Sequence, residues 1–163
     1  FRRSVLEACR VDGSLIDPDY FWYGDDLDLT WRMRLFGFKQ YYIPSLVAHH
    51  DRGTTKSQSQ HWYDVWQRRE QRQRIPLKKR QLDWSNVRFT IIKNDYIINV
   101  LRDSLYILTR EISVFFYTLF FEPRVFFELL RFLRLLPKIL RRRKKVMAKA
   151  KMAPLEIHQW FRT

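Results

Sequence analysis

The spacing of apolar residues near the N-terminus predicts one well-defined helix. Leu27, Trp31 and Leu35 recur at intervals of four residues, after a glycine and three aspartates that suit the start of a helix. Gly37 stands where a C-terminal cap is expected. We therefore predict a helix over about residues 26–36.

The segments on either side of this helix carry other signals. Residues 1–10 favour a short helix, and the turn after it is rich in glycine, aspartate and proline. Beyond the helix, the runs FKQYYIP (38–44) and LVAHH (46–50) predict two short strands that are interrupted at Pro44. The first part of the chain therefore mixes helices and strands.

From about residue 61 the pattern becomes helical. Residues 61–74 predict a polar helix, 75–85 a break, and 86–121 one or two long helices. The last region has apolar positions that step by three and four: Ile98, Leu101, Leu105, Leu108, Ile112, Phe115 and Leu119. Such a stripe predicts a face that is buried against another element.

A basic amphipathic helix is predicted over residues 124–146, with a kink at Pro137. Its Phe and Leu residues lie beside cations that recur every seven positions: Arg124, Arg131, Lys138 and Lys145. Such a segment binds anionic membrane surfaces through apolar burial and charge attraction. The alternative is that its apolar face packs on the long helix or on another subunit of a homo-oligomer.

Composition and charge divide the chain into two parts. The chain has 163 residues, of which 46% are hydrophobic, so it can bury a core. Its single cysteine favours a reducing compartment such as the cytoplasm, and no apolar run approaches a membrane-spanning length. Residues 1–60 carry no net charge, so the whole net charge of +14 lies in the rest. We predict two parts, residues 1–58 and 59–163.

Several short motifs occur in a specific order in the first part and resemble a known enzyme family. They are Phe1-Arg2-Arg3, Gly13-Ser14-Leu15-Ile16-Asp17, Tyr20 to Leu29 with the core Gly24-Asp25-Asp26-Leu27-Asp28, Arg32, Gly37-Phe38, Tyr42-Ile43-Pro44 and His49-His50. Their order resembles the second half of the catalytic domain of inverting GT-A glycosyltransferases, family 2, which includes bacterial rhamnosyltransferases and related enzymes of cell-wall polysaccharide biosynthesis. Asp25 stands where that family usually has glutamate.

The resemblance implies an α/β fold: the second half of a GT-A domain, followed by a mainly α-helical C-terminal extension. It implies transfer of a sugar from a nucleotide-diphospho-sugar donor to a glycan or lipid-linked acceptor. A peripheral location on the inner face of the cell membrane fits such an acceptor. The first half of a GT-A domain is not recognised, so this chain alone is expected to be incomplete and inactive.

The resemblance also assigns roles to individual residues. Asp26 matches the catalytic base, which removes the proton from the acceptor hydroxyl, and the N-terminus of a helix favours its charged form. Asp25, Arg32 and Trp22 are the substrate-binding candidates. The residues alone leave two alternatives open: the aspartates can simply cap the helix, and Arg32 can form a structural salt bridge.

A divalent metal, Mg²⁺ or Mn²⁺, is implied as the cofactor that stabilises the departing nucleoside diphosphate. His50 matches the family's metal-ligating histidine in its distance from Pro44. His49 is the second choice, because the doublet leaves the register open. Taken alone, such histidines are more often ordinary strand-end or surface residues than metal ligands.

Two other classes of function remain as alternatives. A catalytically silent, membrane-associated assembly module would account for the basic amphipathic second part. A nucleic-acid-binding protein would account for the net charge, but no zinc knuckle or RNA-binding motif is recognised and the charge lies on an amphipathic helix. We therefore expect no nucleic-acid partner.

Overall fold

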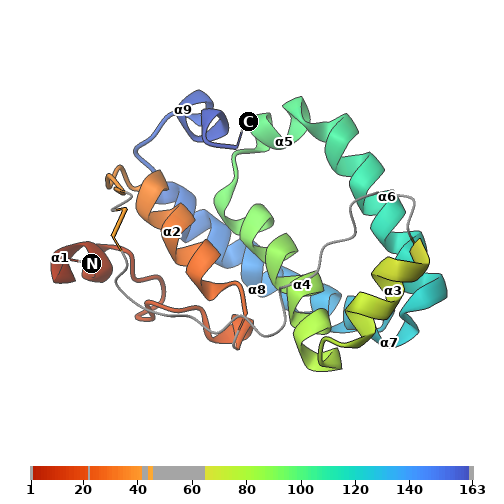
Figure 1. Ribbon diagram of the computed structural model, residues 1–163. Coiled ribbons are helices and arrows are strands. Elements are labelled where there is room, and N and C mark those ends of the chain that lie inside the picture. Colours follow the sequence, from red (N-terminus) through yellow and green to blue (C-terminus); the bar gives the residue numbers. More distant parts are fainter. Residues whose placement is uncertain (1, 22, 42–43, 46–64, 162–163) are drawn as a thin grey trace.

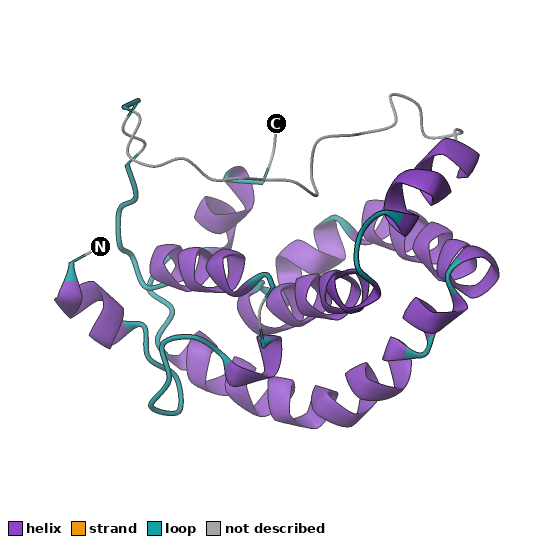
Figure 2. Ribbon diagram, turned by 60° about the horizontal axis from the view of Figure 1, so that its bottom comes forward, coloured by secondary structure: helices purple, strands orange, loops and turns teal. Residues whose placement is uncertain are grey.

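The protein is mainly α-helical in the part of the chain that the structure describes. The computed structural model describes residues 2–21, 23–41, 44–45 and 65–161. About 74% of these residues are helical, and none of them lies in a strand (Figure 2). The predicted α/β fold, with the second half of a GT-A domain, is therefore wrong for this part of the chain. The predicted strand over 46–50 lies outside the described residues.

Residues 38–41 show why the first predicted strand does not form. This segment has no neighbouring strand among the described residues and therefore no backbone ladder to join. Instead, Gln40 donates to the carbonyl oxygen of Thr30 at 2.6 Å and accepts from Arg34 at 3.3 Å. Side-chain hydrogen bonds thus hold the segment along the preceding helix.

The described elements follow one another in a simple order. They are α1 (Arg3–Ala8), the 3-10 turn η1 (Pro18–Tyr20), α2 (Asp25–Leu35), α3 (Val65–Gln73), α4 (Leu77–Asn94), α5 (Ile97–Arg102), α6 (Ser104–Phe121), α7 (Pro123–Phe126), α8 (Glu128–Ala148) and α9 (Pro154–Gln159). The predicted helix over 26–36 is confirmed as α2. The predicted helices over 1–10 and 61–74 are confirmed in the parts that are described.

Helices α4 and α8 pack along each other at the centre of the molecule, and α2 lies against α4 (Figure 1). Phe89 of α4 and Phe132 of α8 stack with ring centroids 5.0 Å apart and an interplanar angle of 6°. Tyr20 and Ile139 are completely buried beside them. Each such buried side chain contributes roughly 1.5–3 kcal/mol of favourable transfer free energy.

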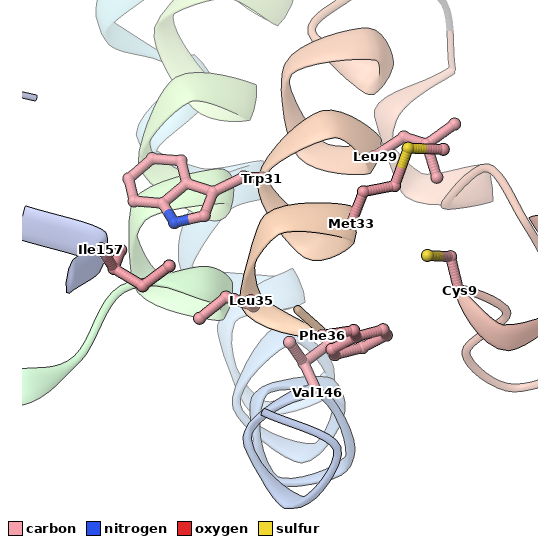
Figure 3. Close-up of a cluster of buried hydrophobic side chains, with 8 residues drawn as sticks. All are labelled: Cys9, Leu29, Trp31, Met33, Leu35, Phe36, Val146 and Ile157. Carbon is pink, nitrogen blue, oxygen red and sulfur yellow. The ribbon is translucent and has the colours of Figure 1, made fainter. Parts of the chain in front are cut away.

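A second cluster joins both ends of the described chain (Figure 3). Its buried members come from the end of α1, from α2, from α8 and from α9: Cys9, Leu29, Trp31, Met33, Leu35, Phe36, Val146 and Ile157. Apolar residues of the predicted parts 1–58 and 59–163 therefore share one core. The predicted boundary between them lies outside the described residues.

The helices of the second part begin and end at different residues from those predicted. The predicted break over 75–85 is wrong, because α4 begins at Leu77, directly after Pro76, and Leu82 is completely buried. Proline suits a position at the start of a helix, where no intrahelical hydrogen bond is lost. Beyond α4, the chain turns at Asp95 and again at Asp103, so the range 86–121, predicted as one or two long helices, contains the end of α4, the short α5 and the long α6.

Helix α6 forms the edge of the molecule, between α5 and α7 (Figure 1). By length and composition alone, α6 is apolar enough to cross a membrane. The sequence did not predict this, because α6 contains no uninterrupted apolar run of membrane-spanning length. Only 6% of it is buried. The expectation that its apolar stripe is buried is therefore wrong for the described chain, where Leu105 is 78% exposed.

The predicted basic amphipathic helix is confirmed as α7 and α8. Pro123 begins α7 and Pro137 lies inside α8, which continues to Ala148. Helix α8 buries Ile139 and Val146 on one side. The same side also carries the buried Arg142, so part of the basic face is directed into the molecule.

Candidate functional site

The N-terminus of α2 is held in place from the loop before it. Gly24 has a φ of +79°, a backbone conformation that suits glycine, and directs the chain into the helix. Asn86 of α4 donates its side-chain amide to the carbonyl oxygens of Tyr20, at 2.9 Å, and Tyr23. These bonds fix the loop on which the acidic motif begins.

The third aspartate of the motif, Asp28, is buried in an ionic network. Its carboxylate lies 2.8 Å from the guanidinium of Arg32 and 2.9 Å from Nζ of Lys93, and it accepts a hydrogen bond from Asn94 at 2.8 Å. A buried charge with this many partners is satisfied, and removing one partner would leave an uncompensated charge. Asp28 therefore anchors α2 to α4.

Arg32 is also fully engaged inside the chain. It is 2% exposed, and besides Asp28 it donates to the carbonyl oxygens of Cys9 and, at 2.7 Å, Leu15. Arg32 was predicted either to bind substrate or to form a structural salt bridge, and the structure contains the salt bridge. Because the side chain is buried, its guanidinium is not accessible to a substrate in this arrangement.

The first two aspartates lie differently. Asp26 is exposed and Asp25 is half-buried, both in the first turn of α2. Asp26 accepts a hydrogen bond from the backbone N–H of Leu27 at 2.8 Å, and no described residue forms an ion pair with it. The other oxygen of the Asp26 carboxylate is therefore open to a molecule that approaches from solvent.

Tyr23 lies near Asp26, and Lys79 and Asp83 lie near Tyr23. Burial raises the pKa of the Tyr23 hydroxyl, and the negative charges of Asp83 and Asp26 raise it further. Burial also raises the pKa of Asp83, although the nearby cations act in the opposite direction. The ammonium of Lys79 lies 5.3 Å from the centre of the Tyr23 ring. An aromatic ring beside carboxylates is a chemically suitable surface for a polyhydroxylated ligand.

Three other predicted site residues, Trp22, His49 and His50, lie outside the described residues, so their predicted roles stay predictions. Within the described ranges, no three His, Cys, Asp or Glu side chains are grouped so that they could hold a metal ion. The predicted Mg²⁺ or Mn²⁺ site stays a prediction, because its ligand His50 and the second choice His49 lie outside the described residues.

A second ionic network was not predicted from the sequence. Aspartates of the turn after α1 meet cations of α4 and α8, in the pairs Asp12–Lys145, Asp12–Arg142, Asp17–Lys93, Asp17–Arg142, Asp19–Lys138 and Asp19–Arg142. Burial acts to raise the pKa of Asp19, but the hydrogen bond from Lys138 and the charge of Arg142 outweigh it and lower the pKa. This network fixes the turn onto α8.

The sequence did contain a signal for this second network. Lys138, Arg142 and Lys145 recur at intervals of four and three, which places them on one face of α8. Asp12, Asp17 and Asp19 all fall within one short turn. The predicted membrane-facing role of the basic run overlooked such intramolecular partners.

A cavity of about 450 Å³ separates α4 from α6. Five of its lining side chains are aromatic, Trp84, Phe116, Tyr117, Phe120 and Phe121, and Asp83 lies on the α4 side. Asp83 thus lies near Tyr23 and also lines this cavity.

Comparisons of the chain with protein-family models, with curated proteins and with solved structures found no match. The resemblance to glycosyltransferases therefore depends on the order and spacing of the residues themselves.

Proposed function

We propose that the chain carries the general base of an inverting glycosyltransferase, Asp26, and positions it for a glycan or lipid-linked acceptor. The donor would be a nucleotide-diphospho-sugar. The reaction would take place at the inner face of the cell membrane, where a lipid-linked acceptor is exposed to the cytoplasm.

One observation carries this proposal: two carboxylates of the motif lie in opposite environments. Asp28 is buried and neutralised by Arg32 and Lys93, whereas Asp26 is exposed on the same rigid turn. A general base needs an accessible carboxylate on a support that does not move. The arrangement provides both, since the buried network holds the helix that presents Asp26.

The chemical step follows from this geometry. The acceptor hydroxyl attacks the anomeric carbon of the donor, and its proton passes to the free oxygen of Asp26. A new carbon–oxygen bond forms as the bond to the diphosphate oxygen breaks, and the nucleoside diphosphate leaves with the electron pair. Attack opposite the leaving group inverts the configuration at that carbon.

The donor side of the reaction is not assigned to described residues. The resemblance implies a divalent cation ligated by His50, with His49 as the second choice, and it implies substrate contacts by Asp25 and Trp22. Asp25 remains a substrate-binding candidate on the same turn as Asp26.

The test is a transfer assay of the full-length natural polypeptide that contains this chain. Nucleoside diphosphate release is measured with a panel of UDP-, GDP- and dTDP-sugars and a membrane lipid and polysaccharide extract as acceptor. We expect Asp26→Asn to lower kcat by at least about 100-fold, the low end for a lost general base, with the donor KM unchanged. Asp26→Glu should recover part of the rate.

Glu70→Gln is the matched control. Glu70 is an exposed acid of α3 whose ion pair with Arg74 lies at the surface. The transfer rate of the Glu70→Gln variant should therefore equal that of the natural sequence. Circular dichroism confirms that the variants are folded. Retention of the natural rate by Asp26→Asn, or no turnover with any donor, would contradict the proposal.

A second candidate function is a non-catalytic membrane-associated module. The exposed apolar surface of α6 favours it. The assay separates the two candidates, because such a module would bind membranes without turning over any donor. Asp26 would then act only in capping α2.

A further inference from the structure

The outer face of α6 is apolar and uncovered within the described chain. At 3.6 residues per turn, Leu105 and Ile112 project opposite to Val114, which lines the cavity toward α4. More than half of each of these two side chains is exposed. The apolar face extends to further exposed residues of α5 and α6: Ile97, Ile98, Leu101, Leu108 and Leu119. We call this set the α5–α6 face.

Few monomeric proteins leave so many large apolar side chains together in water. Single exposed apolar residues are ordinary, but here they follow one another over several helical turns. Burial of this face against a partner would therefore be favourable.

The charges around the α5–α6 face indicate the kind of partner. Every acidic residue from α5 to α7 already has a cationic or histidine partner in the chain: Asp103 with His158, Glu111 with Arg88 and Arg110, and Glu122 with Arg72 and Arg80. Arg102 and Arg124, at the two ends of α6, form no ion pair with any described residue. The face therefore combines apolar side chains with two unpaired positive charges, which suits an anionic amphiphilic partner.

The attachment of α6 fixes how it meets such a partner. Arg88 of α4 donates to Glu111 at 2.8 Å on the inner side of α6. This tie holds the middle of the helix to α4, so the outer face is presented along its whole length. A helix crossing a membrane would have to break this ion pair and take Arg110 and Glu111 into hydrocarbon, which is costly.

We propose that the α5–α6 face binds the surface of an anionic lipid bilayer, with α6 lying in the plane of the interface. Leu and Ile enter the boundary of the acyl chains, while Arg102 and Arg124 bind lipid phosphates. This proposal does not depend on the role of Asp26. It also moves the predicted membrane contact from the basic run of α8 to another surface.

A second copy of the chain fits the same face less well. If two α6 helices packed antiparallel, Arg102 of one copy would lie near Arg124 of the other at both ends. No free acidic residue between α5 and α7 would compensate these charges, because all three are paired internally. Charge complementarity thus favours lipid over an α6–α6 dimer.

The test is flotation of the purified chain with vesicles of phosphatidylcholine containing about 30% phosphatidylglycerol. We expect the natural chain to float with these vesicles and to bind pure phosphatidylcholine more weakly. The triple variant Leu105→Ser, Leu108→Ser and Ile112→Ser should lower the partition coefficient by at least about tenfold, because three large apolar side chains are lost from the contact.

A matched triple variant removes the same number of exposed apolar side chains elsewhere. This control variant combines Ile16→Ser, Leu27→Ser and Leu155→Ser. All three residues are exposed and lie outside the α5–α6 face, so flotation should not change.

Arg102→Gln with Arg124→Gln should remove the preference for anionic vesicles. The corresponding control, Arg2→Gln with Arg3→Gln, should keep it.

Three results would overturn the proposal. The first is equal flotation of the α6 and control triple variants, and the second is no flotation of the natural chain. The third is membrane-bound chain that resists extraction at alkaline pH, which would show a helix crossing the bilayer. If the natural chain instead forms a dimer that the α6 triple variant dissociates, and does not float, the α5–α6 face binds a second copy.

Discussion

At the residue scale, neighbouring residues of the same type have opposite environments. Asp26 and Asp28 are two positions apart in one helix, yet one is exposed and the other is buried between cations. Arg141 and Arg142 differ in the same way, since only Arg142 is buried. Residue type alone therefore does not identify which charge is available to a ligand and which one stabilises the fold.

The pair Arg141 and Arg142 allows a direct test of this difference. Arg142→Met should lower the free energy of unfolding by about 3–5 kcal/mol, because the buried Asp17 and the largely buried Asp19 lose a partner. Arg141→Met, an exposed position one residue earlier, should change it by less than about 0.5 kcal/mol. Urea denaturation followed by far-UV circular dichroism measures both. Equal effects would show that the network of Asp17 and Asp19 does not stabilise the protein.

At the element scale, periodicity predicted α8 well because that helix has one clearly apolar side. Helix α2 was predicted well from its recognisable ends, although it buries side chains on several sides, including the charged Asp28 and Arg32. Periodicity failed at α4, where Lys78, Lys79 and Arg80 precede Leu82 and obscure the apolar period. It also failed for residues 38–41, since a strand depends on a distant partner that a local pattern does not contain. Periodicity located the apolar face of α6. The exposure of this face could not be predicted, because the spacing of apolar residues does not specify which element covers them.

Helix α8 contains a proline whose cost can be measured. Pro137 is exposed, and it lacks the N–H that would donate to the carbonyl oxygen of Leu133. Pro137→Ala should therefore raise the free energy of unfolding by about 1–3 kcal/mol. Lys144→Ala, also exposed on α8, serves as the control and should change it little. A loss of stability in Pro137→Ala would instead show that a bend at the proline is needed for packing on α4.

At the scale of the whole molecule, the described chain divides into a closed core and an uncovered edge. Helices α2, α4 and α8 enclose the two apolar clusters, and the aspartates of the N-terminal turn neutralise the inner face of α8. Helix α6 takes little part in this core. In the arrangement we propose, α6 completes its contacts on an anionic membrane while α2 and α4 hold Asp26 in place.

Hydrogen–deuterium exchange of the chain, with and without anionic vesicles, tests this claim most directly. Amide protection reports how rarely each helix opens, and a helix with few packed neighbours opens often. We predict slow exchange in α4 and α8 under both conditions, and rapid exchange in α6 that becomes slow only with vesicles. Protection of α6 equal to that of α4 in buffer alone, or no change in α6 on adding vesicles, would contradict the account.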